Sequence, residues 1–300
     1  LQHEFGIFPG SDGDGVLDLV ARLHVPVVTV LHTVLIDPSA RQRRVVEELA
    51  QHSAAVVVLT PSAADRLVRR YAVDRSIVSV IPHGAEPNLD PRPREPGAIP
   101  TLLTWGLLGP GKGIEHAIKA VVILAGRGII VRYVVAGQTH PNVVAYEGER
   151  YREALVQLAE ELGAGSLVTF DDRYRDWAGL FALIRTADIV VLPYDSREQV
   201  TSGVLVDAVA SGKPVVATAF PHAVELSTTG AVEVVPHESP IMCADAIGRI
   251  IADDDLRERM ETAARRVGAE HDWAVVGARL HALMASELSV ARQSFGPAGW

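Results

Sequence analysis

The chain has 300 residues, of which 48% are hydrophobic and 22% charged, and its formal net charge at pH 7 is -9. This length exceeds the usual size of one hydrophobic core and predicts two α/β domains of a globular enzyme. The negative charge excludes a general attraction to nucleic acid. No apolar run reaches the roughly 18 residues of a membrane span, although peripheral contact with a membrane stays open. Cys243 is the single cysteine, which excludes an intrachain disulfide and favours a cytoplasmic location.

Strands and helices alternate in the first third of the chain. Strands are predicted at 25–33, 55–60 and 77–84, and helices at 40–53 and 62–71. The strands are near-continuous runs of Val, Ile and Thr, which suit a sheet covered on both faces. The helices between them supply the crossovers of a parallel sheet.

The composition then changes in residues 85–100, which hold five prolines and few apolar side chains. This is typical of a stiff, extended linker, and it predicts a boundary between domain 1–90 and domain 91–288, followed by a tail at 289–300. In the second domain, strands are predicted at 101–106, 129–137, 166–172, 188–194, 214–218 and 233–236, and helices at 113–126, 147–162, 176–186 and 203–211. A charged amphipathic pair of helices is predicted at 239–268 and 271–288.

The first candidate site is the glycine-rich turn from Gly106 to Gly113, which follows a strand and ends where a helix begins. Ligands of open α/β sheets bind beyond the carboxyl ends of strands, and the exposed N–H groups of a helix start favour a phosphate. Lys112 could add a positive charge there. The turn is neither a P-loop nor a dinucleotide fingerprint, so the glycines could instead serve only a tight turn, with Lys112 in solvent.

The second candidate site is the segment 193–218, in which a strand is followed by a polar loop and by Ser202-Gly203 at a helix start. This helix start could hold a diphosphate. Asp207 lies one turn inside the helix and could reach both hydroxyls of a ribose, and Gln199 could contact a sugar. The alternative is that Gln199 is an exposed loop amide and Asp207 an exposed helix charge.

His32 ends the strand VVTVLH, although a lone histidine after a strand is more often structural than catalytic. Asp12-Gly13-Asp14 superficially resembles a metal-binding DxD motif, but its Gly-rich surroundings favour a turn before a helix. No His, Glu and Asp residues have the spacing of metal ligands, so the sequence predicts no metal site.

Taken together, these segments resemble glycosyltransferase family 4, in particular its mannosyltransferase-like bacterial branch, over nearly the whole chain. The matching pieces are LQHEFGIF (1–8), VPVVTVLHT (25–33), VIPHG (80–84), WGLLGPGKG (105–113), VVAGQTHP (134–141), the segment 193–218 and PHAVEL (221–226). The resemblance implies the GT-B fold, in which two Rossmann-like, doubly wound parallel-sheet domains face a cleft. It also implies that the first domain lacks βα units that the family places before Leu1.

The resemblance assigns roles residue by residue. Lys112 matches the lysine that contacts the donor diphosphate, and His32 matches the histidine that contacts the transferred sugar. Gln199 and Asp207 stand where the family has two glutamates, and Leu107 stands where it has an arginine. The catalytic residues implied are His32, Gln199 and Lys112, and the donor-binding residues implied are Gly109, Gly111, Lys112, Gly137, Ser202, Gly203 and Asp207.

The implied function is retaining, metal-independent transfer of a hexose from a nucleoside diphosphate to a glycan, lipid or small-molecule acceptor, without a cofactor. Mannose is the favoured sugar and GDP-mannose the favoured donor. The replacement of an arginine by Leu107 and of a glutamate by Gln199 keeps a non-catalytic nucleotide-sugar-binding module open as an alternative. A nucleotide-sugar epimerase on the same fold is a second alternative.

Overall fold

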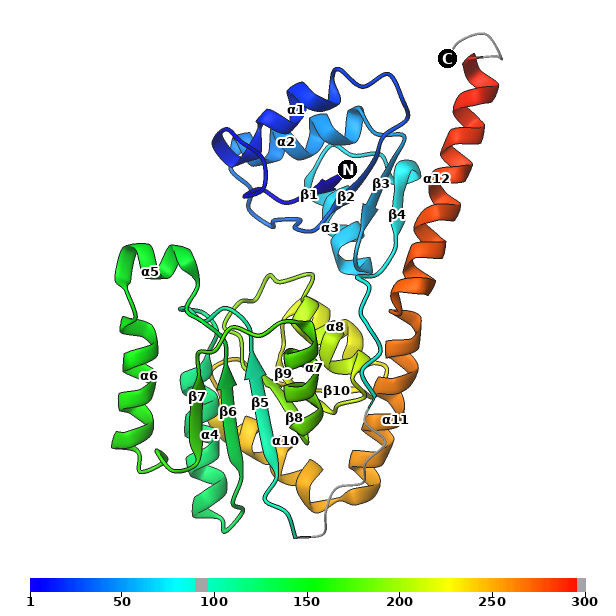
Figure 1. The fold of residues 1–300 in the computed structure, drawn as a ribbon. Coiled ribbons are helices and arrows are strands. Elements are labelled where there is room, and N and C mark those ends of the chain that lie inside the picture. Colours follow the sequence, from blue (N-terminus) through cyan, green and yellow to red (C-terminus); the bar gives the residue numbers. More distant parts are fainter. Residues whose placement is uncertain (90–96, 296–300) are drawn as a thin grey trace. The chain divides into compact units, whose positions relative to one another are not determined.

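Figure 1 shows the computed structural model, which describes residues 1–89 and 97–295, with side chains as far as residue 290. The chain forms two compact units. Unit 1 comprises Leu1–Gly84, Glu198–Thr201 and Trp273–Trp300, and unit 2 comprises Ala85–Arg197 and Ser202–Asp272. Part of the predicted linker, 90–96, lies outside the described residues.

Unit 1 is built on a parallel sheet with the strand order β1-β2-β3-β4. The strands are β1 (Gln2–His3), β2 (Val28–Leu31), β3 (Ala55–Val58) and β4 (Val78–Val80), and the helices are α1 (Gly15–Val20), α2 (Ala40–Gln51), α3 (Pro61–Arg70) and α12 (Trp273–Phe295). Short 3-10 helices lie at Ser11–Gly13 and Arg75–Ile77. Asp12 to Asp14 therefore form a turn before α1, as the sequence predicts.

Successive side chains along a strand point to opposite faces of the sheet, so the core of unit 1 lies on both faces. Val56 and Val58 pack with residues of α2 and α3, while Val57 packs with Val276 of α12. The start of α3 is fixed by Thr60, whose hydroxyl accepts a hydrogen bond from the N–H of Ala63. Such burial contributes about 1.5 to 3 kcal/mol for each aliphatic side chain.

The last helix differs from the sequence prediction. The sequence grouped the terminal helices with the second domain and ended them at 288, but α12 belongs to unit 1 and extends to Phe295. Its apolar stripe accounts for this membership, because Val276 is buried against Val30 and Ile81. Residues 289–295 are therefore helical, and no separate tail begins at 289.

Unit 2 is built on a parallel sheet with the strand order β10-β9-β8-β5-β6-β7. The strands are β5 (Thr101–Trp105), β6 (Arg132–Ala136), β7 (Val168–Asp171), β8 (Ile189–Leu192), β9 (Val215–Thr218) and β10 (Val232–Val235). The helices are α4 (Ile114–Gly126), α5 (Pro141–Glu147), α6 (Arg150–Glu161), α7 (Trp177–Thr186), α8 (Gly203–Ala210), α9 (Pro221–Ser227), α10 (Pro240–Ala252) and α11 (Asp254–Glu270).

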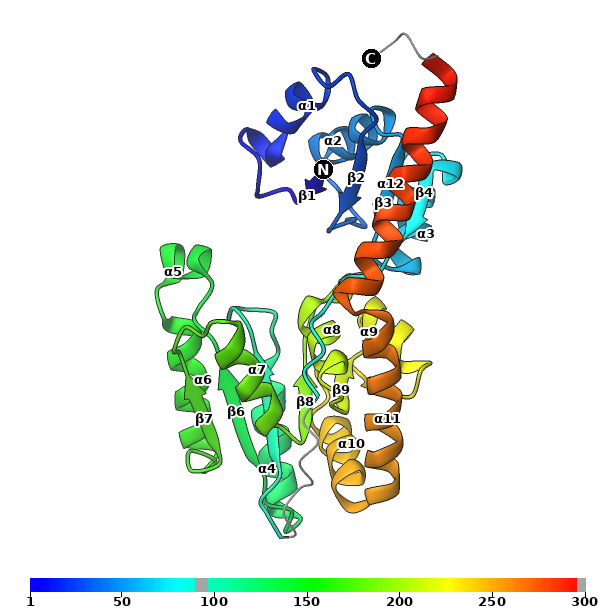
Figure 2. The same cartoon turned by 45° about the vertical axis from the view of Figure 1, so that its right-hand side comes forward.

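Helices cover both faces of this sheet, as Figures 1 and 2 show. Leu102 and Val191 point to the face packed by α4 and α10, and Leu103 and Val190 point to the face packed by α8, α9 and α11. The doubly wound arrangement predicted for the second domain is confirmed. It places the loops that follow β5, β6 and β8 together at the carboxyl edge of the sheet.

Two predicted helices are each divided in the structure. The predicted helix 147–162 overlaps the end of α5 and all of α6, which are separated at Gly148, where φ is 65°. The predicted helix 239–268 is α10 followed by α11. Asp253 has extended backbone between them, and its carboxylate caps α11 by accepting from the N–H of Leu256.

The described part of the predicted linker packs on unit 2. The N–H of Ala85 donates to the carbonyl of His271 at 2.7 Å, and the N–H of Asn88 donates to the carbonyl of Ala210. The Asn88 amide also donates to Ser211. These residues are therefore held in place on unit 2 instead of forming a free spacer.

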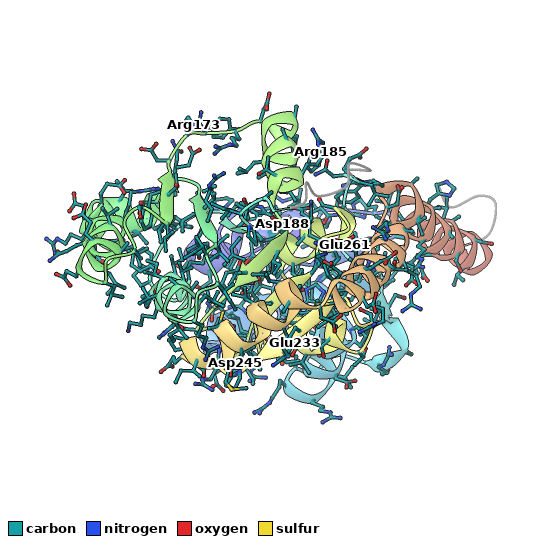
Figure 3. All side chains as sticks on the ribbon, turned by 90° about the horizontal axis from the view of Figure 1, so that it is seen from below. Arg173, Arg185, Asp188, Glu233, Asp245 and Glu261 are labelled. Atoms are coloured by element: carbon teal, nitrogen blue, oxygen red, sulfur yellow. The ribbon has the colours of Figure 1, made fainter. Side chains whose placement is uncertain are left out.

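Ion pairs lie on the outer surface of unit 2, where Figure 3 labels Glu233 and Asp245. Glu233 pairs with Arg249 and Asp245 pairs with Arg127, each at 2.6 Å. Partly exposed pairs of this kind contribute about 0 to 1 kcal/mol each. Within the described residues, no helix is long and apolar enough to cross a membrane.

Candidate functional site

The loops after β5 and β6 touch backbone to backbone at the carboxyl edge of the unit 2 sheet. A Cβ atom on Gly137, where φ is 131°, would lie 2.0 Å from the carbonyl oxygen of Gly106. A Cβ atom on Gly106 would lie 3.7 Å from Val204 in the first turn of α8. At Gly137 only glycine allows this approach, and the distance to Val204 shows that α8 begins beside the same two loops.

The glycine-rich turn ends at Gly113, which is the N-cap of α4 with φ of 62°. A Cβ atom there would lie 1.8 Å from the carbonyl oxygen of Pro193, which follows β8. No side chain of the N-cap residue caps α4, and the N–H of His116 donates to the carbonyl of Gly113 at 2.9 Å. Gly109 is buried, and Gly111 has φ of 87° with open space around its Cα.

Lys112 lies in this turn as a half-buried cation. Its Nζ lies 4.5 Å from the centroid of the Tyr194 ring, which is a cation–π distance. Burial lowers the pKa of Lys112. Within the described residues, no carboxylate lies within ion-pair distance of its ammonium group, so the cation is available to an anionic ligand.

The start of α8 lies beside this turn. The hydroxyl of Ser202 caps the helix by accepting from the N–H of Leu205 at 3.3 Å, and the N–H of Ser202 donates to Nδ1 of His222 at 3.0 Å. Gly203 begins the helix, and its N–H has no partner inside the helix. Asp207 lies one turn further along and is half-buried.

The predicted residues of unit 2 therefore gather at one edge of its sheet: Gly109, Gly111, Lys112, Gly137, Ser202, Gly203 and Asp207. A glycine-lined edge with a half-buried lysine and a helix N-terminus can hold a diphosphate by hydrogen bonds and charge. Tyr194 and His222 were missed by the sequence analysis. Tyr194 is the last residue of the strand predicted at 188–194, and its place at a carboxyl end is a signal that could have drawn attention to it.

His32 lies directly after β2, at the carboxyl edge of the unit 1 sheet. Its Nε2 shares a hydrogen bond of 2.7 Å with Oε1 of Gln2, and an amide oxygen only accepts, so Nε2 carries the proton. The pKa of His32 is lowered, first by burial and then by His83. Nearby, Glu4 accepts from the hydroxyl of Thr33 at 2.6 Å. His32 is therefore held in place by Gln2, and burial disfavours its charged form.

Gln199 is placed differently from its prediction. The sequence put it in the second domain, but Glu198–Thr201 belongs to unit 1. The reason is local, because the carbonyl of Val200 accepts from the hydroxyl of Thr60 at 2.9 Å and Val200 is buried in the unit 1 core. The Gln199 amide donates to the carbonyl of Thr201. His32 and Gln199 thus share one unit, and Lys112 lies in the other.

One group of side chains in unit 2 could hold a metal ion. Glu115, His116 and Asp195 each offer a ligand atom, and these atoms lie within 4.8 Å of one another. The spacing along the sequence could not reveal the group, because Asp195 follows β8 whereas its partners begin α4. Burial is the first cause that raises the pKa of Asp195, and Glu115 is the second.

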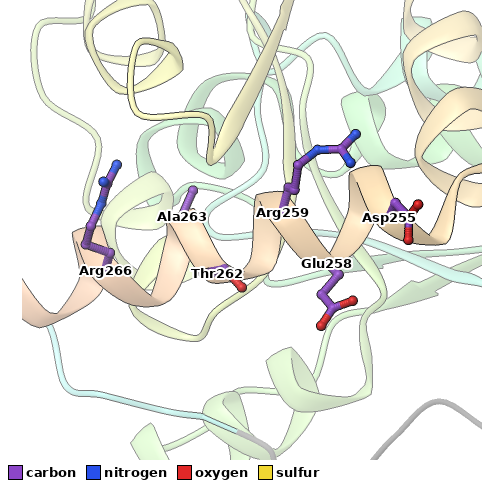
Figure 4. Close-up of a pocket in the computed structure, with 6 residues that line it drawn as sticks. All are labelled: Asp255, Glu258, Arg259, Thr262, Ala263 and Arg266. Atoms are coloured by element: carbon purple, nitrogen blue, oxygen red, sulfur yellow. The ribbon is translucent and has the colours of Figure 1, made fainter.

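A hollow on the surface of unit 2 lies away from this edge of the sheet. It has a volume of about 480 Å³ and is lined by α11 residues that include Asp255, Arg259 and Arg266 (Figure 4). Its lining comes from a single helix with both signs of charge. None of the predicted site residues lines this hollow, so it is not part of the proposed phosphate site.

The glycine backbone, the half-buried cation and the helix start at this edge of unit 2 have the chemistry that suits a phosphate. Residues 86–267 match the family model for glycosyl transferases group 1, and residues 6–89 match the model for glycosyltransferase family 4. The first match covers more than half of the chain, which therefore belongs to the group 1 glycosyltransferases. The resemblance to glycosyltransferase family 4 is confirmed, whereas the mannosyltransferase-like branch stays a prediction.

Curated relatives and solved structures agree with this family. The D-inositol 3-phosphate glycosyltransferase of Corynebacterium glutamicum is 31% identical over 82% of this chain and 60% of its own length. The alpha-D-kanosaminyltransferase of Streptomyces kanamyceticus is 27% identical over 93% of this chain and 77% of its own length. The chain spans about 60 to 65% of the first relatives that it matches.

The structure resembles sucrose-phosphate synthase from Thermosynechococcus elongatus, with a TM-score of 0.78 and 20% identity over 93% of this chain and 72% of the other. It also resembles the Anabaena protein HepE in complex with UDP, with a TM-score of 0.76 and 19% identity over 92% of this chain and 78% of the other. These likenesses and the two parallel sheets confirm the predicted GT-B fold.

Proposed function

We propose that this chain transfers a hexose from a nucleoside diphosphate to an acceptor hydroxyl, with the diphosphate bound at the carboxyl edge of the unit 2 sheet. The observation that carries the proposal is Lys112, a half-buried cation without a carboxylate partner in the described residues. It lies in a glycine-rich turn that packs against the loop after β8 and leads into α4, and α8 begins at the same edge. An anionic ligand would satisfy both the cation and the helix start.

The proposed reaction breaks the bond between the anomeric carbon and the diphosphate oxygen and forms a bond from that carbon to the acceptor oxygen. The acceptor proton leaves to the departing diphosphate. Lys112 and the N–H groups at the start of α8 stabilise the charge that develops on the diphosphate. We propose that this stabilisation works without a divalent metal and that the configuration at the anomeric carbon is retained.

Unit 1 contributes the remaining catalytic residues in this proposal. The lowered pKa of His32 favours the neutral imidazole, so its proposed role is to position a sugar hydroxyl without adding a charge. The resemblance assigns His32 to the transferred sugar and places Gln199 at the position of a family glutamate. Gln199 does not ionise, so its proposed role is a hydrogen bond to the sugar and not charge stabilisation.

The sugar and the acceptor are chosen from the resemblance and from the names of relatives. Mannose and GDP-mannose come from the sequence motifs alone, and the relatives described above are named for D-inositol 3-phosphate and for kanosamine. D-inositol 3-phosphate therefore joins glycans and lipids among the acceptors to be tested. No cofactor is needed for the transfer itself.

The test is mass-spectrometric analysis of products after the chain is incubated with GDP- and UDP-sugars, with and without D-inositol 3-phosphate and simple glycosides. A new glycoside and a free nucleoside diphosphate are the expected products. Interconversion of donor sugars without an acceptor would instead identify an epimerase. Donor binding without turnover across these acceptors would favour the non-catalytic binding module.

A further inference from the structure

A buried histidine, His222, is attached to the start of α8. Its Nδ1 accepts the N–H of Ser202 at 3.0 Å, and both side chains are only 3% exposed. An Nδ1 that accepts carries no proton, so in this hydrogen bond the imidazole is neutral, with its proton on Nε2. His222 lies in the first turn of α9, so α9 is joined to α8 at this bond.

This bond determines which N–H groups of α8 remain for a ligand. The first N–H groups of a helix have no partner within the helix. Here the N–H of Ser202 is taken by His222, and that of Leu205 is taken by the Ser202 hydroxyl. Among the residues that the structure describes, none accepts the two N–H groups between them, on Gly203 and Val204, so these two remain for a phosphate. His222 therefore orients the backbone N–H groups that would bind the phosphate in the proposed function.

A second chain of contacts leads from the same region to Lys112. The ammonium group of Lys112 lies over the ring of Tyr194, and that ring stacks on Phe220 with centroids 5.5 Å apart. Phe220 is fully buried and precedes α9, two residues before His222. The backbone of Tyr194 is fixed as well, because its carbonyl accepts from the hydroxyl of Thr218 at 2.5 Å.

We propose that Tyr194, Phe220 and His222 form a positioning frame that holds both Lys112 and the first turn of α8 in place to bind the two phosphates of a nucleoside diphosphate. This inference rests on the proposed function. The frame residues are positioning residues, because they act through Lys112 and α8. The frame should therefore raise the affinity for a ligand with two linked phosphates more than the affinity for a ligand with one.

The test compares matched variants at both ends of the frame. His222→Leu keeps a buried apolar side chain and removes the acceptor for Ser202, whereas His222→Asn retains an acceptor oxygen near the position of Nδ1. Tyr194→Leu removes the ring beneath Lys112, whereas Tyr194→Phe keeps it. Calorimetry measures the Kd of UDP, GDP, UMP and GMP, and circular dichroism verifies that each variant is folded.

The frame predicts that His222→Leu and Tyr194→Leu weaken binding of the preferred nucleoside diphosphate by about tenfold. The affinity of these two leucine variants for the matching monophosphate should change by less than about threefold. The affinity of His222→Asn and Tyr194→Phe for the diphosphate should also change by less than about threefold. The frame would be overturned if the leucine variants lost equal affinity for the monophosphate and the diphosphate. It would also be overturned if they folded and bound the diphosphate with wild-type affinity. Either result would leave the proposed function standing. If the wild-type chain binds neither diphosphate, the proposed function fails as well.

Discussion

The carboxyl edges of the two sheets differ in chemistry although both sheets are parallel. In unit 2 the edge is built from glycine backbone, one half-buried cation and a helix start, which suit an anion. In unit 1 it carries Gln2, Glu4, His32 and Thr33, linked in hydrogen-bonded pairs. Neutral donors and a carboxylate suit hydroxyl groups. The comparison teaches that a shared architecture leaves the loops after the strands to decide the ligand.

The largest effect is expected at the unit 1 edge. His32→Ala should lower kcat by about 100-fold or more, because a positioned catalytic side chain contributes about that much. The Kd of the nucleoside diphosphate should stay within about threefold of wild type, because that ligand belongs to unit 2. Steady-state kinetics and calorimetry measure the two values. His52→Ala, at an exposed position on the same unit, is the control, and equal losses in kcat and affinity would break the division between the edges.

The next effect is expected at Lys112. Lys112→Ala should lower kcat/KM by about 10- to 100-fold, because a hydrogen bond to a charged group contributes about 1.5 to 3 kcal/mol. Lys119→Ala removes an exposed lysine of the neighbouring helix α4 and should leave kcat/KM unchanged. Similar losses in both variants would mean that general charge, and not the placement of Lys112, attracts the donor.

The glycine backbone of the unit 2 edge is tested by a matched pair of alanine variants. Gly113→Ala should lower the free energy of unfolding by about 2 kcal/mol or more, because its φ is positive and its Cβ would meet the carbonyl of Pro193. Gly111→Ala has a similar φ but open space, so only the smaller conformational cost of about 1 kcal/mol is expected. Urea unfolding measures both. Equal losses would contradict the close packing described for Gly113.

The lowered pKa of Lys112 gives a smaller, pH-dependent effect. Lysine is charged below its pKa, so affinity for a nucleoside diphosphate should fall as pH rises through a value below that of a free lysine. Since the unfolded chain holds this proton more tightly, the Lys112 contribution to stability rises over the same range. Calorimetry between about pH 7 and 10 tests this. Lys112→Arg should remove the loss of affinity at alkaline pH. If the loss persists in this variant, another group causes it.

The smallest effect is expected from metal removal. EDTA should change kcat/KM by less than about twofold if charge stabilisation comes from Lys112 and α8. A larger loss that is restored by Mg²⁺ or Mn²⁺ and abolished in Asp195→Asn would assign a metal to the group of Glu115, His116 and Asp195. That result would replace the metal-independent mechanism.

Local sequence patterns predicted most of the secondary structure but not the contacts between distant segments. Runs such as AVVV and IVVL specify buried strands, and glycines mark the turns that follow them. The membership of α12 and of Gln199 in unit 1 depends on contacts with residues more than 130 positions away, such as Thr60 with Val200. The bond between His222 and Ser202 likewise depends on how α9 packs beside α8, which periodicity along the sequence does not reveal.

The central claim, that unit 2 binds a nucleoside diphosphate, is tested most directly by thermal unfolding with UDP, GDP and their sugar conjugates in the presence of EDTA. A ligand that binds only the folded chain raises its melting temperature. We predict that one of these nucleotides stabilises the wild-type chain and Lys119→Ala but not Lys112→Ala. If none shifts the melting temperature at about millimolar concentration, the donor site proposed at the carboxyl edge of unit 2 is contradicted.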